Sequence, residues 1–309
     1  MMEKKVSVIG AGFVGTMVAQ RIAEKNLADV VLLDIVEGLP QGKALDIMQS
    51  APIEGFSGTV TGSNDFAGTT QSDIVVFTAG FPRTPGMSRD ELALKNGGIV
   101  QSVIKEITRH APDCIIIMVT NPLDVMTQIA WKTSGFSPQR VMGMGGVLDT
   151  ARYRAFLAEE LGVHPGEIEA LVLGSHGDTM VPVAINTTVK GVPVSRIIQK
   201  ERLEAIIDRT KKGGAEIVGL LKSGSAWHAP SSSVVAMVEA ILTDSKICLP
   251  ASAYLTGQYG IRDIYIGVPV KLGAAGVEEI YEITLSDDEA EGLRQSAEAV
   301  RETLDNLEM

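Results

Sequence analysis

Among the histidines of this chain, His176 has the setting best suited to chemistry. It lies in the stretch Gly174–Asp178, directly after an apolar run, where nearby glycines on both sides shield its ring little. Imidazole both accepts and donates a proton near neutral pH. From this local setting alone, a functional and a structural role for His176 stay equally open. The histidines at positions 110, 164 and 228 are interpreted as structural or surface residues.

Asp149 and Arg152 lie three residues apart at the start of a predicted helix, and hence on one helical face. A carboxylate beside a histidine fixes the tautomer of the imidazole and stabilises its protonated form. Arg152 would then be left to bind a substrate carboxylate through its bidentate guanidinium. A simple ion pair at a helix start explains the same two residues, so the spacing alone does not decide between these interpretations.

Two arginines, Arg83 and Arg89, lie in a loop at residues 81–89 that contains two prolines and a glycine. This composition excludes regular structure there. Solvated side chains are the ordinary interpretation of loop arginines. Two cations on one loop of an acidic protein also suit an anionic ligand.

The first segment of the chain has the spacing of a dinucleotide-binding turn. A β-branched run at 4–9 meets Gly10, Gly12 and Gly15 in the pattern G-x-G-x-x-G, and a predicted helix follows. These glycines would permit a tight turn, close approach of a pyrophosphate, and close packing of helix on strand. The helix start favours a phosphate. A glycine turn without a ligand is the alternative interpretation.

Asp34 ends the second apolar run, about 20 residues after the glycine motif. Its carboxylate could accept hydrogen bonds from both ribose hydroxyls of an adenosine, and its charge would repel a 2′-phosphate. The residue therefore predicts NAD rather than NADP as the cofactor.

Predicted strands and helices alternate from residue 4 to about residue 146. This alternation predicts a Rossmann-type, doubly wound parallel sheet with helices on both faces. Ligands bind beyond the carboxyl ends of such strands, where the loops at 10–15, 80–89 and 120–121 all fall. The second half mixes short strands with helices at 148–161, 201–222, 234–243 and from 286 to about 307. We therefore expect an NAD-binding domain at 1–146 and an α+β substrate-binding and catalytic domain at 147–309.

The amino-acid composition of the chain limits the kinds of molecule that it is expected to bind. Of the 309 residues, 45% are hydrophobic, which is ample for a buried core, and the formal net charge of −11 disfavours nucleic acid and anionic membranes. No apolar run is long enough to span a bilayer. Cys114 and Cys248 form no metal-ligand cluster, so no metal is expected, and a reducing cytoplasm fits this cysteine usage.

Four motifs together resemble the 2-hydroxyacid dehydrogenases of the lactate/malate type, in order and spacing over essentially the whole chain. They are Gly10–Gly15, Val119–Pro122, Leu148–Arg152 and Gly174–Asp178. The resemblance implies that His176 is the general base or acid and that Asp149 stabilises its imidazolium. It also implies hydride transfer between a small 2-hydroxy acid and NAD, in a homo-oligomer for which a tetramer is favoured over a dimer.

The same resemblance assigns the ligand contacts. Arg152 would bind the carboxylate beside the reacting carbon, Arg83 the distal carboxylate, Arg89 the carbonyl and Asn121 the substrate. The residues expected to hold the cofactor are Gly10, Gly12, Phe13, Val14, Gly15, Asp34, Asn96, Val119 and Asn121. The stretch 224–230 would line the substrate pocket.

Lactate dehydrogenases of this family carry glutamine where this chain has Arg83. A guanidinium suits a second carboxylate, so the chain resembles the lactate-dehydrogenase-like subgroup that interconverts (S)-malate and oxaloacetate, a step of the tricarboxylic acid cycle. A lactate or broad-specificity 2-hydroxyacid dehydrogenase is the nearest alternative. An NAD-dependent glycosidase would need a metal held by cysteine and histidine, and a nucleotide-sensing module would have no use for Asp149, Arg152 and His176 together.

Overall fold

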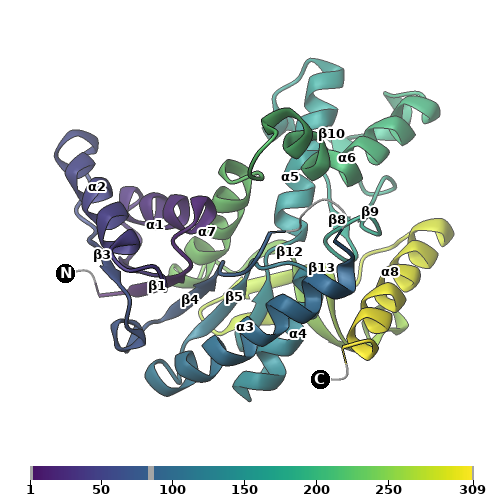
Figure 1. Cartoon of the computed structure of the whole chain (residues 1–309). Helices are drawn as coiled ribbons and strands as arrows, with labels where there is room; N and C mark the ends of the chain where they lie inside the picture. The colour runs from purple at the N-terminus through teal and green to yellow at the C-terminus, as the bar shows by residue number, and fades with distance from the viewer. Residues whose placement is uncertain (1–2, 83–86, 308–309) are drawn as a thin grey trace.

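In the part of the chain that the structure describes, the largest sheet has nine strands, and it runs through the centre of the molecule (Figure 1). The computed structural model describes residues 3–82 and 87–307, apart from the side chain of Arg89. Six strands are parallel, in the order β3-β2-β1-β4-β5-β6. They are β1 (Lys5–Ile9), β2 (Asp29–Leu33), β3 (Val60–Ser63), β4 (Ile74–Phe77), β5 (Ile115–Met118) and β6 (Val141–Gly143). This is the strand order of a doubly wound dinucleotide-binding sheet, so the predicted fold class is confirmed.

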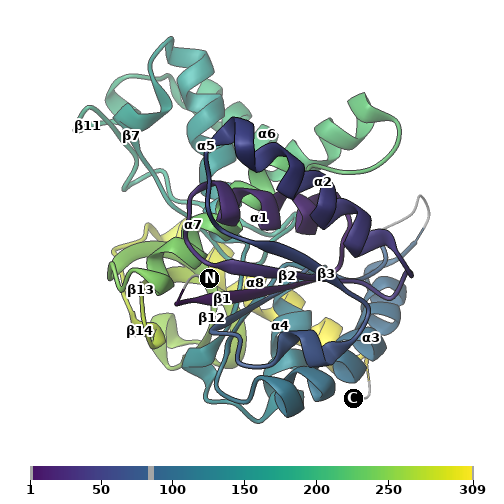
Figure 2. The same cartoon turned by 90° about the vertical axis from the view of Figure 1, so that its left-hand side faces the viewer.

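Helices cover both faces of this sheet. One face carries α1 (Phe13–Glu24), α2 (Leu39–Glu54) and α7 (His228–Leu242), and the other carries α3 (Arg89–His110) and α4 (Leu123–Ser134), as Figures 1 and 2 show. The central strands are apolar along their whole length because both of their faces are covered; every residue of β4 and β5 is buried.

Three antiparallel strands from the second half extend the same sheet. They are β12 (Ile247–Thr256), β13 (Arg262–Gly273) and β14 (Gly276–Ile280), and β12 joins the parallel part by pairing Ser252 with Gly143 of β6. The larger hydrophobic core accordingly contains side chains from both halves, such as Val8 and Ile266. The domain boundary near residue 146 therefore stays a prediction, since neither the sheet nor this core is interrupted there.

The remaining elements build a lobe beside the sheet. They include α5 (Gly146–Leu161), α6 (Lys200–Leu221), β7 (Ile168–Glu169), β8 (Val172–Leu173), β9 (Val181–Pro182), β10 (Thr188–Val189) and β11 (Val192–Pro193). Short 3-10 helices lie at Phe66–Thr69, Pro138–Arg140, Pro165–Glu167, Val194–Arg196 and Gln258–Gly260. A second, smaller core packs around Tyr153 and Leu157 of α5.

The largest difference from a predicted helix boundary lies at the start of α7. The predicted helix at 234–243 begins six residues earlier, at His228, and contains Pro230 in its first turn. Proline is tolerated there because the first amide groups of a helix have no intrahelical acceptor. The serines that follow bond to carbonyls of the preceding turn, such as Ser233 Oγ to Ala229 O at 2.8 Å, so the polar composition concealed the helix.

The last helix, α8 (Asp287–Asp305), begins with the capping box that the sequence predicts. Ser286 Oγ accepts the amide of Glu289, and the Glu289 carboxylate accepts the amide of Ser286 at 2.9 Å. Glu289 also accepts the amide of Ala184 at 2.7 Å, which ties the start of α8 to the segment after β9.

We expect Ser286→Ala to lower the free energy of unfolding by about 1 kcal/mol, because it leaves the amide of Glu289 without its acceptor. Urea unfolding followed by circular dichroism measures the change. Ser102→Ala, which removes an exposed hydroxyl inside α3, is the matched control and should be nearly neutral. Equal stability of the Ser286 variant and the parent protein would contradict the role of this cap.

Candidate active site

The three motif glycines serve two different purposes in the structure. A Cβ on Gly15 would overlap the carbonyl oxygen of Gly10, and a Cβ on Gly10 would lie 2.8 Å from the amide nitrogen of Ala79. Gly10 also has a φ of +102°. Both residues are therefore required by packing of the protein on itself. A Cβ on Gly12, in contrast, would meet no atom within 4 Å, so its surface is open to a ligand.

The amino end of α1 is left available for an anion. Gly12 is its N-cap and gives no side-chain cap, and the first turn holds no acid. Asp34 is fixed beside this turn, because its carboxylate accepts the amide of Ala11 at 2.7 Å and that of Val36 at 3.0 Å. Lys43 Nζ donates to the carbonyl of Ala11 at 2.6 Å. An open glycine, a free helix terminus and an acid beyond the second strand fit NAD.

Asn96 joins the carboxyl ends of β4 and β5. This side chain is fully buried; its amide group donates to the carbonyl of Asn121 at 2.7 Å, and its oxygen accepts the amide of Phe81 at 2.8 Å. Thr120 Oγ1 completes the connection by donating to the carbonyl of Ala79 at 2.7 Å. Asn96 thus holds the turns on both sides of the predicted site, and its cofactor contact stays a prediction, as do those of Val119 and Asn121.

His176 and Asp149 meet as the sequence analysis expects. Nδ1 of His176 lies 2.8 Å from one carboxylate oxygen of Asp149 and 3.1 Å from the other. The side chain of Asp149 is 2% exposed and that of His176 is 15% exposed. Because an ionised carboxylate only accepts hydrogen bonds, Nδ1 is assigned the proton and Nε2 is left as the acceptor in the neutral ring.

Opposing influences act on the protonation of His176. Burial lowers the pKa of the imidazole, while the charge and hydrogen bond of Asp149 raise it, and Arg152 lowers it again. The net result is a pKa above the ordinary value. The protonated ring is therefore stabilised in this site, as an imidazole that receives a proton from a hydroxyl requires.

Arg152 lies on the same turn of α5, with its Nη1 3.4 Å from Asp149. Burial lowers the pKa of this guanidinium, against the opposing effect of Asp149. Its Nε is buried and lacks a hydrogen-bond partner among the described residues. A buried cation with an unused donor is costly unless an anion completes it, so the geometry suits a substrate carboxylate.

Gly213 of α6 makes room for this arginine. A Cβ on Gly213 would lie 3.2 Å from Cδ of Arg152, whereas one on Gly214 would lie 3.6 Å from an Nη atom, at ordinary contact distance. Sequence reasoning missed this function of Gly213. The signal was available, because two adjacent glycines inside a predicted helix destabilise it and are typical of close approach by another group.

Aromatic rings connect the cofactor turn to the stretch 224–230. The ring of Phe13 stacks on that of Trp227 with centroids 5.0 Å apart, although Phe13 is 66% exposed overall. Trp227 is the N-cap of α7. The glycine turn and the predicted substrate-pocket segment, more than 200 positions apart in the sequence, therefore lie side by side.

Two predicted substrate contacts are not located by the structure. Arg83 lies outside the described residues. Arg89 is the first residue of α3, and the capping box of Ser88 and Glu91 fixes where that helix begins. The side chain of Arg89 is not described, so the roles of both arginines stay predictions.

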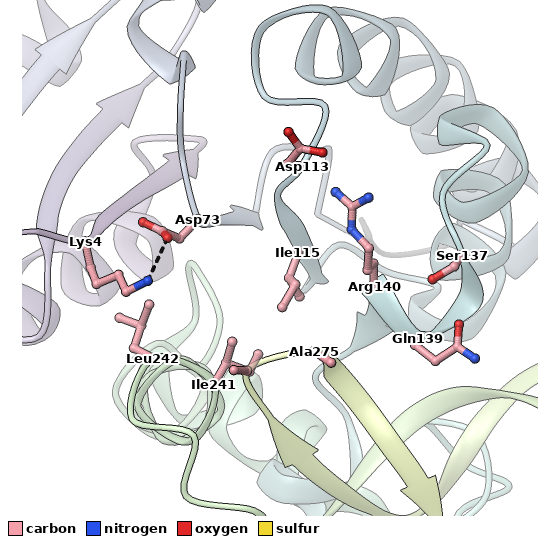
Figure 3. Close-up of a pocket in the computed structure, with 11 residues that line it drawn as sticks. Lys4, Asp73, Asp113, Ile115, Ser137, Gln139, Arg140, Ile241, Leu242 and Ala275 are labelled. Carbon is pink, nitrogen blue, oxygen red and sulfur yellow. Dashed lines mark hydrogen bonds and ion pairs between the residues drawn. The ribbon is translucent and has the colours of Figure 1, made fainter.

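A cavity of about 510 Å³ lies at the opposite edge of the sheet (Figure 3). Its lining includes Lys4, Asp73 and Arg140, which precede β1, β4 and β6, so it opens at the amino ends of the strands. Lys4 pairs with Asp73 at 3.2 Å, and Arg140 donates to the carbonyl of Cys114 at 2.8 Å. Lys4, Asp73 and Arg140 are engaged within the protein, and we assign the cavity no ligand.

Within residues 3–82 and 87–307, no group of three or more histidine, cysteine, aspartate or glutamate residues could hold a metal ion. In the same part of the chain, no helix is both long and apolar enough to cross a membrane.

A dinucleotide-binding sheet with a buried histidine–carboxylate pair defines a nicotinamide-dependent oxidoreductase. Comparison with family models agrees: residues 4–143 match the NAD-binding domain of lactate/malate dehydrogenases, and residues 146–308 match the α/β C-terminal domain of that family. The chain therefore belongs to the lactate/malate dehydrogenase family and carries its NAD-binding domain.

Individual relatives include both branches of the family. A malate dehydrogenase of Roseiflexus castenholzii is 55% identical over 99% of each chain. The structure of a malate dehydrogenase from Salinibacter ruber has a TM-score of 0.94 and 51% identity, covering 98% of this chain and 97% of that one. A lactate dehydrogenase from Cryptosporidium parvum, solved with lactic acid and NAD, has a TM-score of 0.97 and 41% identity, covering 100% and 99%. The backbone fold is thus shared by both activities.

We expect Asp149→Asn to lower the pKa of His176, because the substitution removes the carboxylate that opposes the effect of burial. NMR titration of the imidazole in the free protein measures this, with the resonance assigned by comparison with His176→Gln. Glu160→Gln on the same helix, which breaks an exposed pair with Arg202, should leave the titration of His176 unchanged. A pKa for the Asp149 variant equal to or above that of the parent would contradict the assignment.

Proposed function

We propose that this chain is an NAD-dependent malate dehydrogenase that interconverts (S)-malate and oxaloacetate. The observation that supports this most directly is the buried pair of His176 and Asp149 beside Arg152, whose Nε has no partner among the described residues. A proton acceptor next to an unsatisfied guanidinium suits a 2-hydroxy acid, which presents a hydroxyl and a carboxylate on neighbouring carbons. The malate dehydrogenases at 51–55% identity support the choice of substrate.

In this proposal, Arg152 binds the carboxylate beside the reacting carbon and orients the hydroxyl toward Nε2 of His176. The neutral imidazole takes the hydroxyl proton, and Asp149 stabilises the resulting imidazolium through Nδ1. The turn at Gly12 and the carboxylate of Asp34 would hold NAD, which would supply the acceptor for the hydride from C2 of the substrate. In the reverse direction, protonated His176 returns the proton to the carbonyl oxygen. Arg89 polarises that carbonyl, and Asn121 hydrogen-bonds the substrate.

Arg83 sets the choice of substrate in this proposal. Oxaloacetate carries a second carboxylate that neutralises the guanidinium, whereas pyruvate presents a methyl group and leaves it unpaired. A desolvated, unpaired charge disfavours the wrong substrate by roughly 3–5 kcal/mol, which corresponds to about 10²–10⁴-fold in specificity.

We expect the parent protein to oxidise NADH with oxaloacetate far faster than with pyruvate, and Arg83→Gln to shift this ratio toward pyruvate. Initial rates of NADH oxidation over a concentration series of each acid give the two kcat/KM values. Lys105→Gln, which removes a cation from the middle of α3, is the control for loss of a positive charge elsewhere. An equal preference for both acids in the parent would favour a broad-specificity enzyme, and an unchanged ratio in Arg83→Gln would contradict the role of Arg83.

The cofactor preference depends on the charge of Asp34. Asp34→Asn keeps an oxygen that accepts the amide of Ala11 but removes the charge that repels a 2′-phosphate. We therefore expect its NADH/NADPH ratio of kcat/KM to fall by at least about tenfold, mainly through tighter NADPH binding. Asp113→Asn, which neutralises an exposed acid lining the cavity at the amino ends of the strands, is the control. A ratio that stays at the parent value would show that Asp34 does not select the cofactor.

We further propose the two-domain division at 1–146 and 147–309, a cytoplasmic location, and a homo-oligomer with four rather than two subunits. Exposed apolar side chains on α2 support self-association, since Leu45 is 60% exposed and Ile53 is 86% exposed. A malate dehydrogenase of this kind would serve the tricarboxylic acid cycle.

A further inference from the structure

Asp124 is a buried carboxylate that the mechanism above does not use. It lies in the first turn of α4, three residues after Asn121, and is 2% exposed. One carboxylate oxygen accepts the main-chain amide of His176 at 3.0 Å, and the other accepts the hydroxyl of Ser252 at 2.6 Å. A single side chain therefore connects α4, β12 and the loop that carries the catalytic histidine.

The histidine loop is held at two consecutive amides. The amide of Ser175 donates to Ser296 Oγ of α8 at 2.8 Å, and the next amide, that of His176, donates to Asp124. Because the Cα of His176 is attached directly to the second of these amides, the bond to Asp124 fixes the position of the backbone from which the imidazole extends. The contact with Asp149 then fixes the orientation of the ring.

We propose that Asp124 is a positioning residue, which holds the backbone of His176 so that the imidazole reaches both Asp149 and the substrate. Asp124 acts through His176 and does not touch the reacting atoms. It also couples the histidine loop to the turn of Asn121, because Asp124 lies in the first turn of α4 and Asn121 lies two residues before that helix. This inference rests on the proposed function only for its kinetic test.

The chemistry of the contact explains why a carboxylate is suited to this position. The His176 amide and the Ser252 hydroxyl both donate hydrogen bonds to it, and an ionised carboxylate accepts at both oxygens. Burial raises the pKa of the Asp124 carboxyl, while the hydrogen bonds from Ser252, Ser175 and the His176 amide oppose that rise. Without the carboxylate, the His176 amide would be a buried donor without an acceptor.

The test compares Asp124→Ala with Asp124→Asn. Alanine removes the acceptor, and we expect kcat for malate oxidation at saturating substrates to fall by about 10²-fold, since misplacement of a catalytic group by about 1 Å has that effect. Asparagine keeps one oxygen for the His176 amide and turns its amide group toward Ser252. It should therefore restore at least about tenfold of the loss. NADH affinity should stay at the parent value in both variants.

Asp73→Ala is the matched control. Asp73 also accepts a main-chain amide, that of Lys5 at 2.8 Å, but at the opposite edge of the sheet (Figure 3). We expect lower stability and an unchanged kcat for this variant. Two results would overturn the proposal: a folded Asp124→Ala protein with kcat within about threefold of the parent, or an Asp124→Asn protein as impaired as the alanine variant.

If Asp124→Ala does not fold, Ser252→Ala replaces it, because that change removes the hydroxyl that orients the carboxylate and so loosens its contact with the His176 amide. It should lower kcat by about tenfold without changing NADH affinity, and an unchanged kcat would contradict the proposal.

A structural readout separates this inference from the proposed function. In the free protein, the Nδ1 proton of His176 that is bonded to Asp149 should give a downfield NMR resonance. We expect it to be retained in Asp124→Asn and lost in Asp124→Ala or weakened in Ser252→Ala. A parent protein inactive on malate would end the proposed function and leave this readout intact. A resonance unchanged in the alanine variants would end the role of Asp124.

Discussion

The contact between the imidazole of His176 and the carboxylate of Asp149 constrains the rest of the structure. Its two members come from different elements, the loop after β8 and the first turn of α5, and both are largely buried. A charged hydrogen bond in a desolvated site stabilises the protein only if both groups are held firmly in place. The glycine at 145 permits this approach, since a Cβ there would lie 3.0 Å from Cβ of His176.

Asp149 is shared between the imidazole of His176 and the guanidinium of Arg152, and this sharing would link proton transfer to substrate binding. It contacts both His176 and Arg152, whose charge disfavours protonation of the histidine. A substrate carboxylate on Arg152 would offset part of that repulsion. Binding of the acid would therefore stabilise the imidazolium, and the proton would be accepted most readily when the substrate is in place.

The parallel half of the fold was predictable because its signals are local. The runs that form β4 and β5 are apolar on both faces, and the glycine motif marks the turn after β1. How the antiparallel strands join this sheet was not predictable, because the pairing of Ser252 with Gly143 joins residues more than 100 positions apart. In the candidate site, the Asp-x-x-Arg spacing indicated the Asp149–Arg152 pair directly, whereas the proximity of His176 was inferred from the family resemblance.

Asp124 shows why a positioning residue escapes sequence analysis. An acid in the first turn of a helix already has an ordinary explanation, since it interacts favourably with the helix dipole. The partners that give it another role, Ser252 and the amide of His176, come from distant segments. One of these partners is a main-chain amide, which every residue except proline has, so the residue type at that position gives no indication of the contact. The extended sheet brings these partners together: β12 carries Ser252 beside β6, next to the helix start that also presents Asn121. The strand β12, whose partner in the sheet the sequence does not indicate, thus connects the histidine loop to the turn of Asn121.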